Sequence, residues 1–336
     1  MDQGMVKIIR KNLGIIAFLG YPALILLLPE TGVFKANFLY GILIFCLAIY
    51  PRIISVNKLA FFTFIILGLI IFIDAALSND KFNLSLASSP IILFYTIFPF
   101  LIGIKHDIPS GRFYRNALLI ICVLILFQQG FNFNIRQTSI SGLGPISIGM
   151  LGCLLIFSSL VSGFRDLSII LGLAVVILSG TRSMFLLAMI FLLIKRRSFI
   201  VPAALIFLFY VIRYDIDVES NFSIVRRLSQ SVDNPRELIW GSFLKEIRES
   251  YFLFPSPTRL KLSNQLGYTY PHNSIIELIA LLGALALPVC ILIVRRTAIK
   301  WRKVVFFLPV IFASFFSFSI YTNFYMWLYL GYIAKK

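Results

Sequence analysis

Apolar runs long enough to cross a lipid bilayer recur from one end of this sequence to the other. The hydrocarbon core of a bilayer is about 30 Å thick, and a helix needs about 20 mostly apolar residues to cross it. Each run here is closed by a short cluster that contains charged residues, proline, glycine or asparagine. Because 59% of the residues are hydrophobic and only 13% are charged, a soluble core with a polar surface is excluded. The sequence predicts an all-α polytopic membrane protein, with a single integral membrane domain over residues 1–336.

We expect about twelve transmembrane helices from these runs. Several runs are shorter than a full span, so the corresponding helices should tilt little or extend into the interface. The predicted spans cover residues 13–28, 38–50, 59–77, 90–104, 116–131, 145–161, 167–178, 183–194, 199–212, 274–294, 304–319 and 322–334.

Lysine and arginine predict the orientation of the spans, because short cytoplasmic loops keep positive charge. With a cytoplasmic amino terminus, nineteen of the 31 basic residues fall in cytoplasmic segments, and only Lys35, Lys81, Arg136 and Arg182 fall in short outer loops. The other eight lie in residues 213–272, between the ninth and tenth spans. Both termini should therefore be cytoplasmic, with 213–272 as one large outer loop. This distribution also accounts for most of the net charge of +17, so no nucleic-acid partner is expected.

The large outer loop contains one predicted short amphipathic helix, over residues 236–250. Asn234 stands before a proline that suits the first helical turn. Ile239, Phe243 and Ile247 then follow at a spacing of four residues and form an apolar stripe. Such a helix would lie on the membrane surface with this stripe against lipid or against the spans. A solvated structural helix is the alternative.

His272 stands at the end of the large loop, where the tenth span begins. An imidazole at that position can accept a proton from a hydroxyl near neutral pH, as transfer to an alcohol requires. Asn273 can cap the helix that follows, and Glu277 lies one turn beyond Asn273 on the same face. The alternative for His272 is an interfacial residue that only caps or anchors the span.

Four arginines are candidates for binding a phosphate group. Arg182 follows a very tight turn between two spans, and a guanidinium held at the membrane surface can bind phosphate or pyrophosphate through two hydrogen bonds. Arg226, Arg227 and Arg236 in the large loop could bind phosphate or sugar acids in the same way. Each of these three could equally pair with a neighbouring carboxylate, and Arg182 could be a lone arginine that reaches to the interface.

Asp215 and Asp217 match the Asp-x-Asp pattern with which some glycosyltransferases bind a divalent cation. They lie just after a span and beside Arg213, so surface pairing is the preferred interpretation. We therefore expect no metal site.

Taken in order, these residues resemble the O-antigen polymerase and ligase superfamily. The resemblance covers roughly residues 179–283 by motif, and the rest of the chain only by topology. Each motif is short, but their order, spacing and common placement on the outer face make the combination more specific. The matching residues are Leu178, Ser179, Gly180, Thr181, Arg182 and Ser183, then Arg236, Leu238 and Trp240, then His272, Asn273, Glu277 and Gly283.

This resemblance implies a GT-C-like fold in a bacterial inner membrane, with an active site that faces the periplasm. It implies that a glycan on undecaprenyl pyrophosphate is transferred with inversion, without a metal ion and without a cofactor. Arg182 and Arg236 would then hold the pyrophosphate, and His272 would be the catalytic base that activates the acceptor hydroxyl. The chain departs from many relatives at residues 252–257, which read Phe-Leu-Phe-Pro-Ser-Pro instead of Pro-Leu-x-Gly-x-Gly. That departure bears on the path of the loop and on the sugars it accepts.

Within the superfamily we favour a Wzy-type repeat-unit polymerase for O-antigen or capsule, because the chain is compact and rich in phenylalanine. The expected partners are the undecaprenyl-pyrophosphate-linked oligosaccharide, membrane lipids, a chain-length regulator and a flippase. An O-antigen ligase that transfers glycan to lipid A-core is the first alternative. A lipid-linked oligosaccharide flippase or other transporter is an alternative of another class. It predicts charged residues along a central cavity, whereas this chain gathers its polar residues on one face.

Overall fold

The computed structural model is almost entirely helical. The structure describes residues 3–27, 32–49, 54–77, 89–106, 111–128, 143–161, 166–195, 240–241, 244–245, 248, 273–301, 307–316 and 323–336. Within these ranges there is no β-strand, and one isolated antiparallel bridge joins Val56 to Lys335. The predicted all-α class is therefore confirmed. The predicted ninth span, 199–212, and most of the large loop lie outside the described residues.

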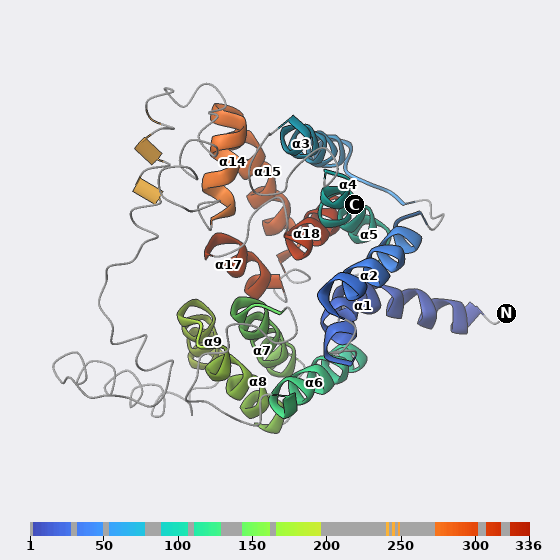
Figure 1. Cartoon of the computed structure of the whole chain (residues 1–336), viewed down its shortest axis with the longest axis vertical. Helices are drawn as coiled ribbons and strands as arrows, with labels where there is room; N and C mark the ends of the chain where they lie inside the picture. Colours follow the sequence, from blue (N-terminus) through green and yellow to red (C-terminus); the bar gives the residue numbers. More distant parts are fainter. Residues whose placement is uncertain are drawn as a thin grey trace.

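The described helices overlap the other predicted spans. The first group is α1 (Gln3–Leu27), α2 (Gly32–Ile49), α3 (Lys58–Leu77), α4 (Ser89–Tyr95), α5 (Ile97–Lys105), α6 (Gly111–Gln128), α7 (Pro145–Val161), α8 (Asp166–Ser179) and α9 (Arg182–Lys195). After the large loop come α14 (Ser274–Leu282), the 3-10 turn η4 (Gly283–Leu285), α15 (Ala286–Ile299), α17 (Leu308–Phe316) and α18 (Phe324–Ala334). Figure 1 shows α18 in the middle, and it packs against α3, α5, α15 and α17.

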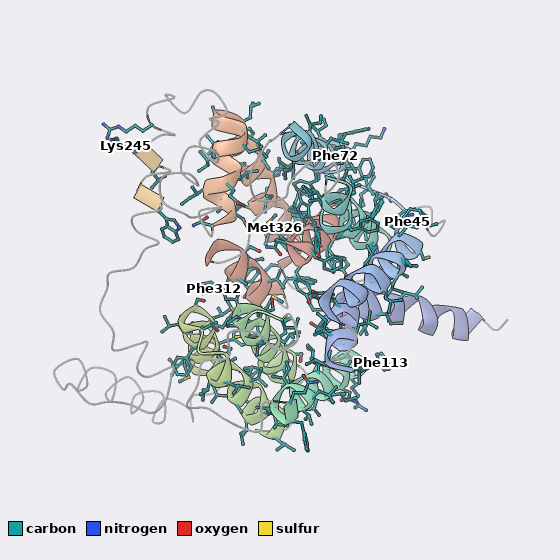
Figure 2. All side chains as sticks on the ribbon, in the orientation of Figure 1. Phe45, Phe72, Phe113, Lys245, Phe312 and Met326 are labelled. Carbon is teal, nitrogen blue, oxygen red and sulfur yellow. The ribbon has the colours of Figure 1, made fainter. Side chains whose placement is uncertain are left out.

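The outward faces of the helices are apolar as well as the inward faces. In α3, large apolar side chains at three- and four-residue spacing are 45–67% exposed, and another apolar row on the opposite side is buried. Phe45 and Phe113 likewise project from the outside of the bundle (Figure 2). A helix that is apolar all round suits lipid and not water, which supports a membrane location. The exposed row of α3 is Leu59, Phe62, Ile66, Leu69 and Ile73, and the buried row is Ala60, Phe64, Leu67 and Ile71.

The predicted span 90–104 is interrupted in the structure, where α4 and α5 are separated by a turn at Thr96. Pro99 causes the break, because it has no N–H to donate to the carbonyl of Tyr95 and its ring crowds that carbonyl. The Thr96 hydroxyl donates to the carbonyl of Ile92 at 2.7 Å and so satisfies part of the last turn of α4.

The predicted tenth span is helical but kinked. Among the described residues, Ser274–Ile299 is the one helical run of 18 residues or more that is apolar enough to cross a membrane. Gly283 breaks this run with φ 56° and ψ −132°, a conformation that favours glycine because it carries no Cβ. α14 and α15 therefore meet at an angle, with η4 between them.

One end of the bundle, which we call the basic end, gathers the carboxyl ends of α2, α5, α15 and α18. Lys105 at the end of α5 donates to the carbonyl of Ala48 at the end of α2. Arg296 in the last turn of α15 donates from Nε to the carbonyl of Ile333 and from Nη2 to that of Lys335, both at 2.8 Å. Cations suit this position, because the last carbonyls of a helix have no partner within it.

The opposite end of the bundle is held by amides and hydroxyls. Gln128 at the end of α6 donates to the carbonyl of Leu26 at the end of α1, at 2.6 Å. Asn323, before α18, donates from Nδ2 to Ser314 Oγ in α17 at 2.5 Å. The carboxyl ends of α1 and α6 and the amino end of α18 thus lie opposite the basic end. A chain that crosses a membrane in alternating directions would have this arrangement of helix ends.

Glycines allow α5 and α18 to run side by side in the same direction. A Cβ added to Gly103 would overlap the carbonyl oxygen of Leu328, and one added to Gly331 would overlap that of Phe100. Each glycine thus lies directly against the backbone of the other helix. Small residues at crossings of apolar helices let the backbones approach closely, and dispersion contacts then hold the pair together.

Substitution Gly331→Ala should lower the thermal unfolding midpoint of the detergent-purified protein by several degrees. The added methyl group meets backbone and cannot be accommodated by a side-chain movement, and overpacking of this kind costs about 1–3 kcal/mol. That cost exceeds the roughly 1 kcal/mol that alanine gains over glycine in helix propensity. Gly41→Ala in α2 is the matched control, because its Cβ would make only an ordinary 3.6 Å contact with Phe94. Equal midpoints for the two variants would contradict the close crossing.

Candidate functional site

The amino end of α14 is the best-defined part of the candidate site. Asn273 is extended, with φ −153° and ψ 109°, and its Oδ1 accepts hydrogen bonds from the backbone N–H groups of Ile275 at 3.0 Å and Ile276 at 3.2 Å. These bonds satisfy two of the N–H groups that the first turn leaves without a helical partner. The predicted capping role of Asn273 is confirmed, and its role in substrate binding stays a prediction.

Glu277 lies on the first turn of the same helix and is only 4% exposed. Its backbone N–H donates to the carbonyl of Asn273 at 3.1 Å, which closes the first helical turn. A carboxylate is stabilised near a helix amino end by the partial positive charge of the unpaired N–H groups. The structure therefore buries an acidic side chain one turn beneath the capped amino end.

Trp240 brings the large loop against α14. Its side chain packs against the small cluster that Ile276 and Ala280 form on one face of that helix, and Ile279 packs against the same cluster. The predicted loop helix therefore contacts the span that begins at Asn273.

The described residues of the loop helix are all helical. They are Trp240, Gly241, Leu244, Lys245 and Arg248, and all except Trp240 are exposed. The exposed positions recur at three- and four-residue spacing, so they form one face. The apolar stripe predicted for the other face, Ile239, Phe243 and Ile247, lies outside the described residues.

The turn between α8 and α9 is as tight as predicted, and it is buried. Gly180 has φ 61°, and its N–H donates to the carbonyl of Ile177 at 3.0 Å. The hydroxyls of Ser179 and Thr181 are 2.7 Å apart. A Cβ added to Gly149 of α7 would lie 2.5 Å from Thr181 Oγ1, so this glycine permits the turn to press against α7.

The remaining predicted site residues fall outside the described part of the chain. Arg182 is the first residue of α9, but only its backbone is described. His272, Arg226, Arg227 and Arg236 are not described. Their convergence on the amino end of α14 therefore stays a prediction, as does the surface pairing of the carboxylates at positions 215 and 217.

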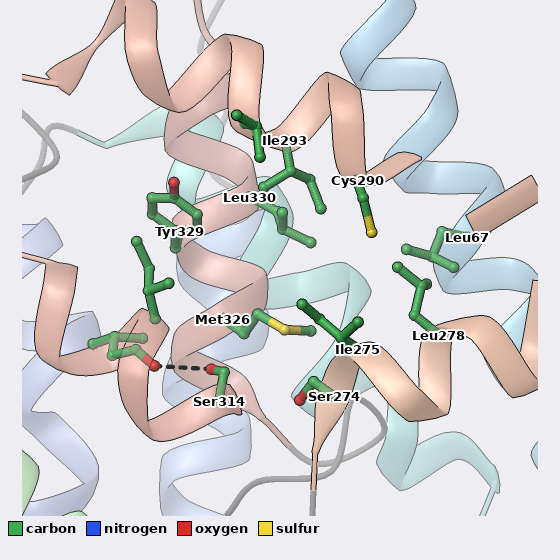
Figure 3. A pocket seen from close by; sticks show the side chains of 13 residues that line it. Leu67, Ser274, Ile275, Leu278, Cys290, Ile293, Ser314, Met326, Tyr329 and Leu330 are labelled. Carbon is green, nitrogen blue, oxygen red and sulfur yellow. Dashed lines mark hydrogen bonds between the residues drawn. The ribbon is translucent and has the colours of Figure 1, made fainter. Parts of the chain in front are cut away.

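An apolar cavity of about 130 Å³ lies directly behind α14 (Figure 3). Thirteen side chains from α3, α14, α15, α17 and α18 line it. Two of the three hydroxyls in its walls are engaged elsewhere, since Ser314 Oγ donates to the carbonyl of Val310 at 2.9 Å and Tyr329 Oη bonds to Thr297 Oγ1. The surface that the lining exposes to the cavity is apolar.

Sequence reasoning did not find this cavity. Its walls come from α3 and from four helices within residues 274–334, so they depend on tertiary packing and no local pattern marks them. Gly283 was the one local signal, because a glycine that breaks a long apolar helix bends it away from its neighbours. Cys290 on α15 and Ser274 on α14 are small residues on the cavity side of this kink.

Comparison of the chain with models of protein families, with curated proteins and with solved structures finds no match. The geometry described above is therefore the basis for a functional proposal.

Substitution Asn273→Ala should destabilise the first turn of α14 by about 1 kcal/mol, because two N–H groups lose their acceptor. Hydrogen exchange followed by mass spectrometry should then show faster exchange at Ile275 and Ile276. Asn273→Ser is the matched control, since serine caps about as well as asparagine. If activity fell in the serine variant while exchange stayed slow, the amide itself would be implicated in substrate binding.

Proposed function

We propose that this protein is a Wzy-type polymerase of the O-antigen polymerase and ligase superfamily. Its substrates are oligosaccharide repeat units of O-antigen or capsule, carried on undecaprenyl pyrophosphate. The protein crosses a bacterial inner membrane about twelve times with a GT-C-like arrangement. Both termini are cytoplasmic, and residues 213–272 form a periplasmic loop between the ninth and tenth spans.

The amino end of α14 is the observation that carries this proposal. It brings together the Asn273 cap, the buried Glu277 and, from the large loop, Trp240. All three belong to the motif set that resembles the superfamily. His272 is covalently adjacent to the cap, which supports a position at the same end of the helix.

The distribution of charge supports the orientation. In the described residues, Lys105, Arg296, Lys300 and Lys335 stand at the basic end, and Lys300 Nζ donates to the carbonyl of Tyr332 at 3.0 Å. Short cytoplasmic segments retain positive charge, so the basic end is the cytoplasmic end. The amino end of α14 then faces the periplasm.

The proposed reaction needs a base and a stabilised leaving group. His272 takes the proton from a hydroxyl of the acceptor sugar, and that oxygen attacks the anomeric carbon of the donor glycan from the face opposite the pyrophosphate. The bond from the anomeric carbon to the pyrophosphate oxygen breaks with inversion. Arg182 and Arg236 hold the departing pyrophosphate, whose negative charge needs hydrogen-bond donors and no strong acid. Arg226 and Arg227 bind phosphate or acidic sugars nearby, and neither a metal ion nor a cofactor takes part.

Cysteine labelling tests the orientation. A membrane-impermeant maleimide added from the periplasmic side should label Gly144→Cys at the start of α7, where an added Cβ has no neighbour within 4 Å. Lys58→Cys, which is exposed at the start of α3, should be labelled only after the membrane is opened. The four native cysteines lie in predicted spans, so the wild-type protein is the low-labelling background. The opposite pattern would invert the orientation, and labelling of both from one side would contradict it.

Glycan length tests the activity. In the host with its chromosomal gene deleted, the wild-type gene should restore long glycan chains, whereas His272→Ala or Arg182→Ala should leave a single repeat unit on the core. Loss of a general base costs roughly 100-fold or more, enough to suppress the ladder. Arg295→Ala is the matched control, because Arg295 is an exposed arginine at the basic end. Membrane levels of every variant are measured by immunoblot.

Each outcome of that experiment separates two functions. Normal ladders with both substituted proteins would make His272 and Arg182 structural residues and remove the catalytic assignment. If the wild-type gene leaves the core unmodified, glycan transfer to lipid A-core or export of the lipid-linked unit is the missing step. The ligase or the flippase would then replace the polymerase.

A further inference from the structure

The cavity behind α14 has the properties of a binding site for a hydrocarbon chain. It lies between Ile275 and Leu278 of α14 on one side and Met326 and Leu330 of α18 on the other. A cavity whose walls offer no polar partner is unfavourable for water, because a water molecule there would lose hydrogen bonds that the walls cannot replace. An apolar ligand gains the dispersion contacts that the empty walls lack.

The volume and the opening of the cavity identify the ligand class. Cavities close to 130 Å³ hold an apolar group of roughly the size of benzene, or about one five- or six-carbon stretch of chain. Val294 lines the cavity and is also 68% exposed on the outside of the bundle. The cavity therefore meets the outer apolar surface at this residue. Leu287 and Ile291 of the same helix are exposed on that surface, which faces lipid in a membrane.

We propose that this cavity binds a hydrocarbon chain that enters from the membrane past Val294 and packs against the inner face of α14. The chain could belong to a bulk phospholipid or to the isoprenoid of a lipid-linked substrate, and the binding chemistry is the same for both. Occupancy by an isoprenoid rests on the proposed function, whereas occupancy by a hydrocarbon chain does not. In either case the bound segment fills the space between α14 and α18, directly below the helix turn that Asn273 caps.

Photo-crosslinking of the full-length protein in nanodiscs tests this site without any glycan turnover. One set of nanodiscs contains a phospholipid with a diazirine in the middle of an acyl chain. A second set contains a polyprenyl phosphate with a diazirine near the phosphate end of the isoprenoid. After illumination, peptide mass spectrometry should find cross-links at Ile275, Leu278, Cys290 or Ile293 of the wild-type protein with at least one of the two probes. Absence of cross-links at all four positions with both probes would overturn the proposal.

Cavity filling supplies the second arm. Cys290→Phe places a phenyl ring in the cavity and should lower the cross-link yield at Ile275 and Leu278 at least fivefold. Leu287→Phe is the matched control, because Leu287 is 66% exposed on the same helix and does not line the cavity. An undiminished yield in Cys290→Phe would overturn the proposal. If that variant does not fold, Ile293→Phe replaces it, and the wild-type cross-link map remains decisive.

The two probes separate the possible sources of the chain. Labelling of the cavity by the polyprenyl phosphate, reduced by excess unlabelled polyprenyl phosphate, assigns the cavity to a lipid carrier. Labelling by the phospholipid alone supports a hydrocarbon site that bulk lipid occupies and leaves the glycosyl-transfer proposal to its own glycan-length experiment. A protein that makes no polymer but labels at these residues would retain the site and lose only the proposed reaction.

Discussion

Unpaired backbone groups at helix ends are the constraint on which the rest of this structure depends. An apolar environment offers no water to bond them, so each break in a helix needs a side chain to replace the missing partner. Thr96 does this where α4 stops, and Asn273 does it where α14 starts. Arg296 bonds two carbonyls at the end of α18. In the described part of the chain, these polar side chains therefore stand where helices begin and end, and the amino end of α14 is one such place.

The amino end of α14 combines this structural requirement with the proposed chemistry. The amide of Asn273 is committed to two backbone N–H groups, which leaves the Nδ2 group as the part of that side chain able to serve a substrate. Glu277 is buried just beneath, and Trp240 packs on another face of the helix. A base at position 272 would thus stand on a rigid, capped helix end, as accurate positioning of a catalytic group requires.

Much of the fold could be predicted because apolar runs and their closing clusters determine helices directly. The cap at Asn273 and the tight turn through Gly180 were also predictable, since both depend on a few adjacent residues. The helix breaks were harder. Pro99 separates α4 from α5, yet Pro22 lies inside an unbroken α1. A proline removes one helical hydrogen bond at either place, so its presence alone does not predict whether the helix breaks.

Glycine is ambiguous in the same way. Gly283 bends a helix, whereas Gly103 and Gly331 lie within α5 and α18 and let the backbones of these two helices approach closely. Only the positions of neighbouring helices distinguish the two uses, and those positions are not encoded locally. The cavity was unpredictable for this reason. The predicted roles of His272 and of the arginines come instead from the resemblance of short motifs. The structure describes none of these side chains, so their roles stay predictions.

The central place of α18 has a consequence for the order in which the molecule assembles. α5 leaves the ribosome more than two hundred residues before α18, an interval on the order of ten to forty seconds at ordinary rates of synthesis. During that time Phe100 can already pack against Phe61 and Phe64 of α3, whereas Gly103 lacks the backbone of α18 that it lies against in the finished protein. The close crossing of α5 and α18 can therefore form only after the last helix has been synthesised.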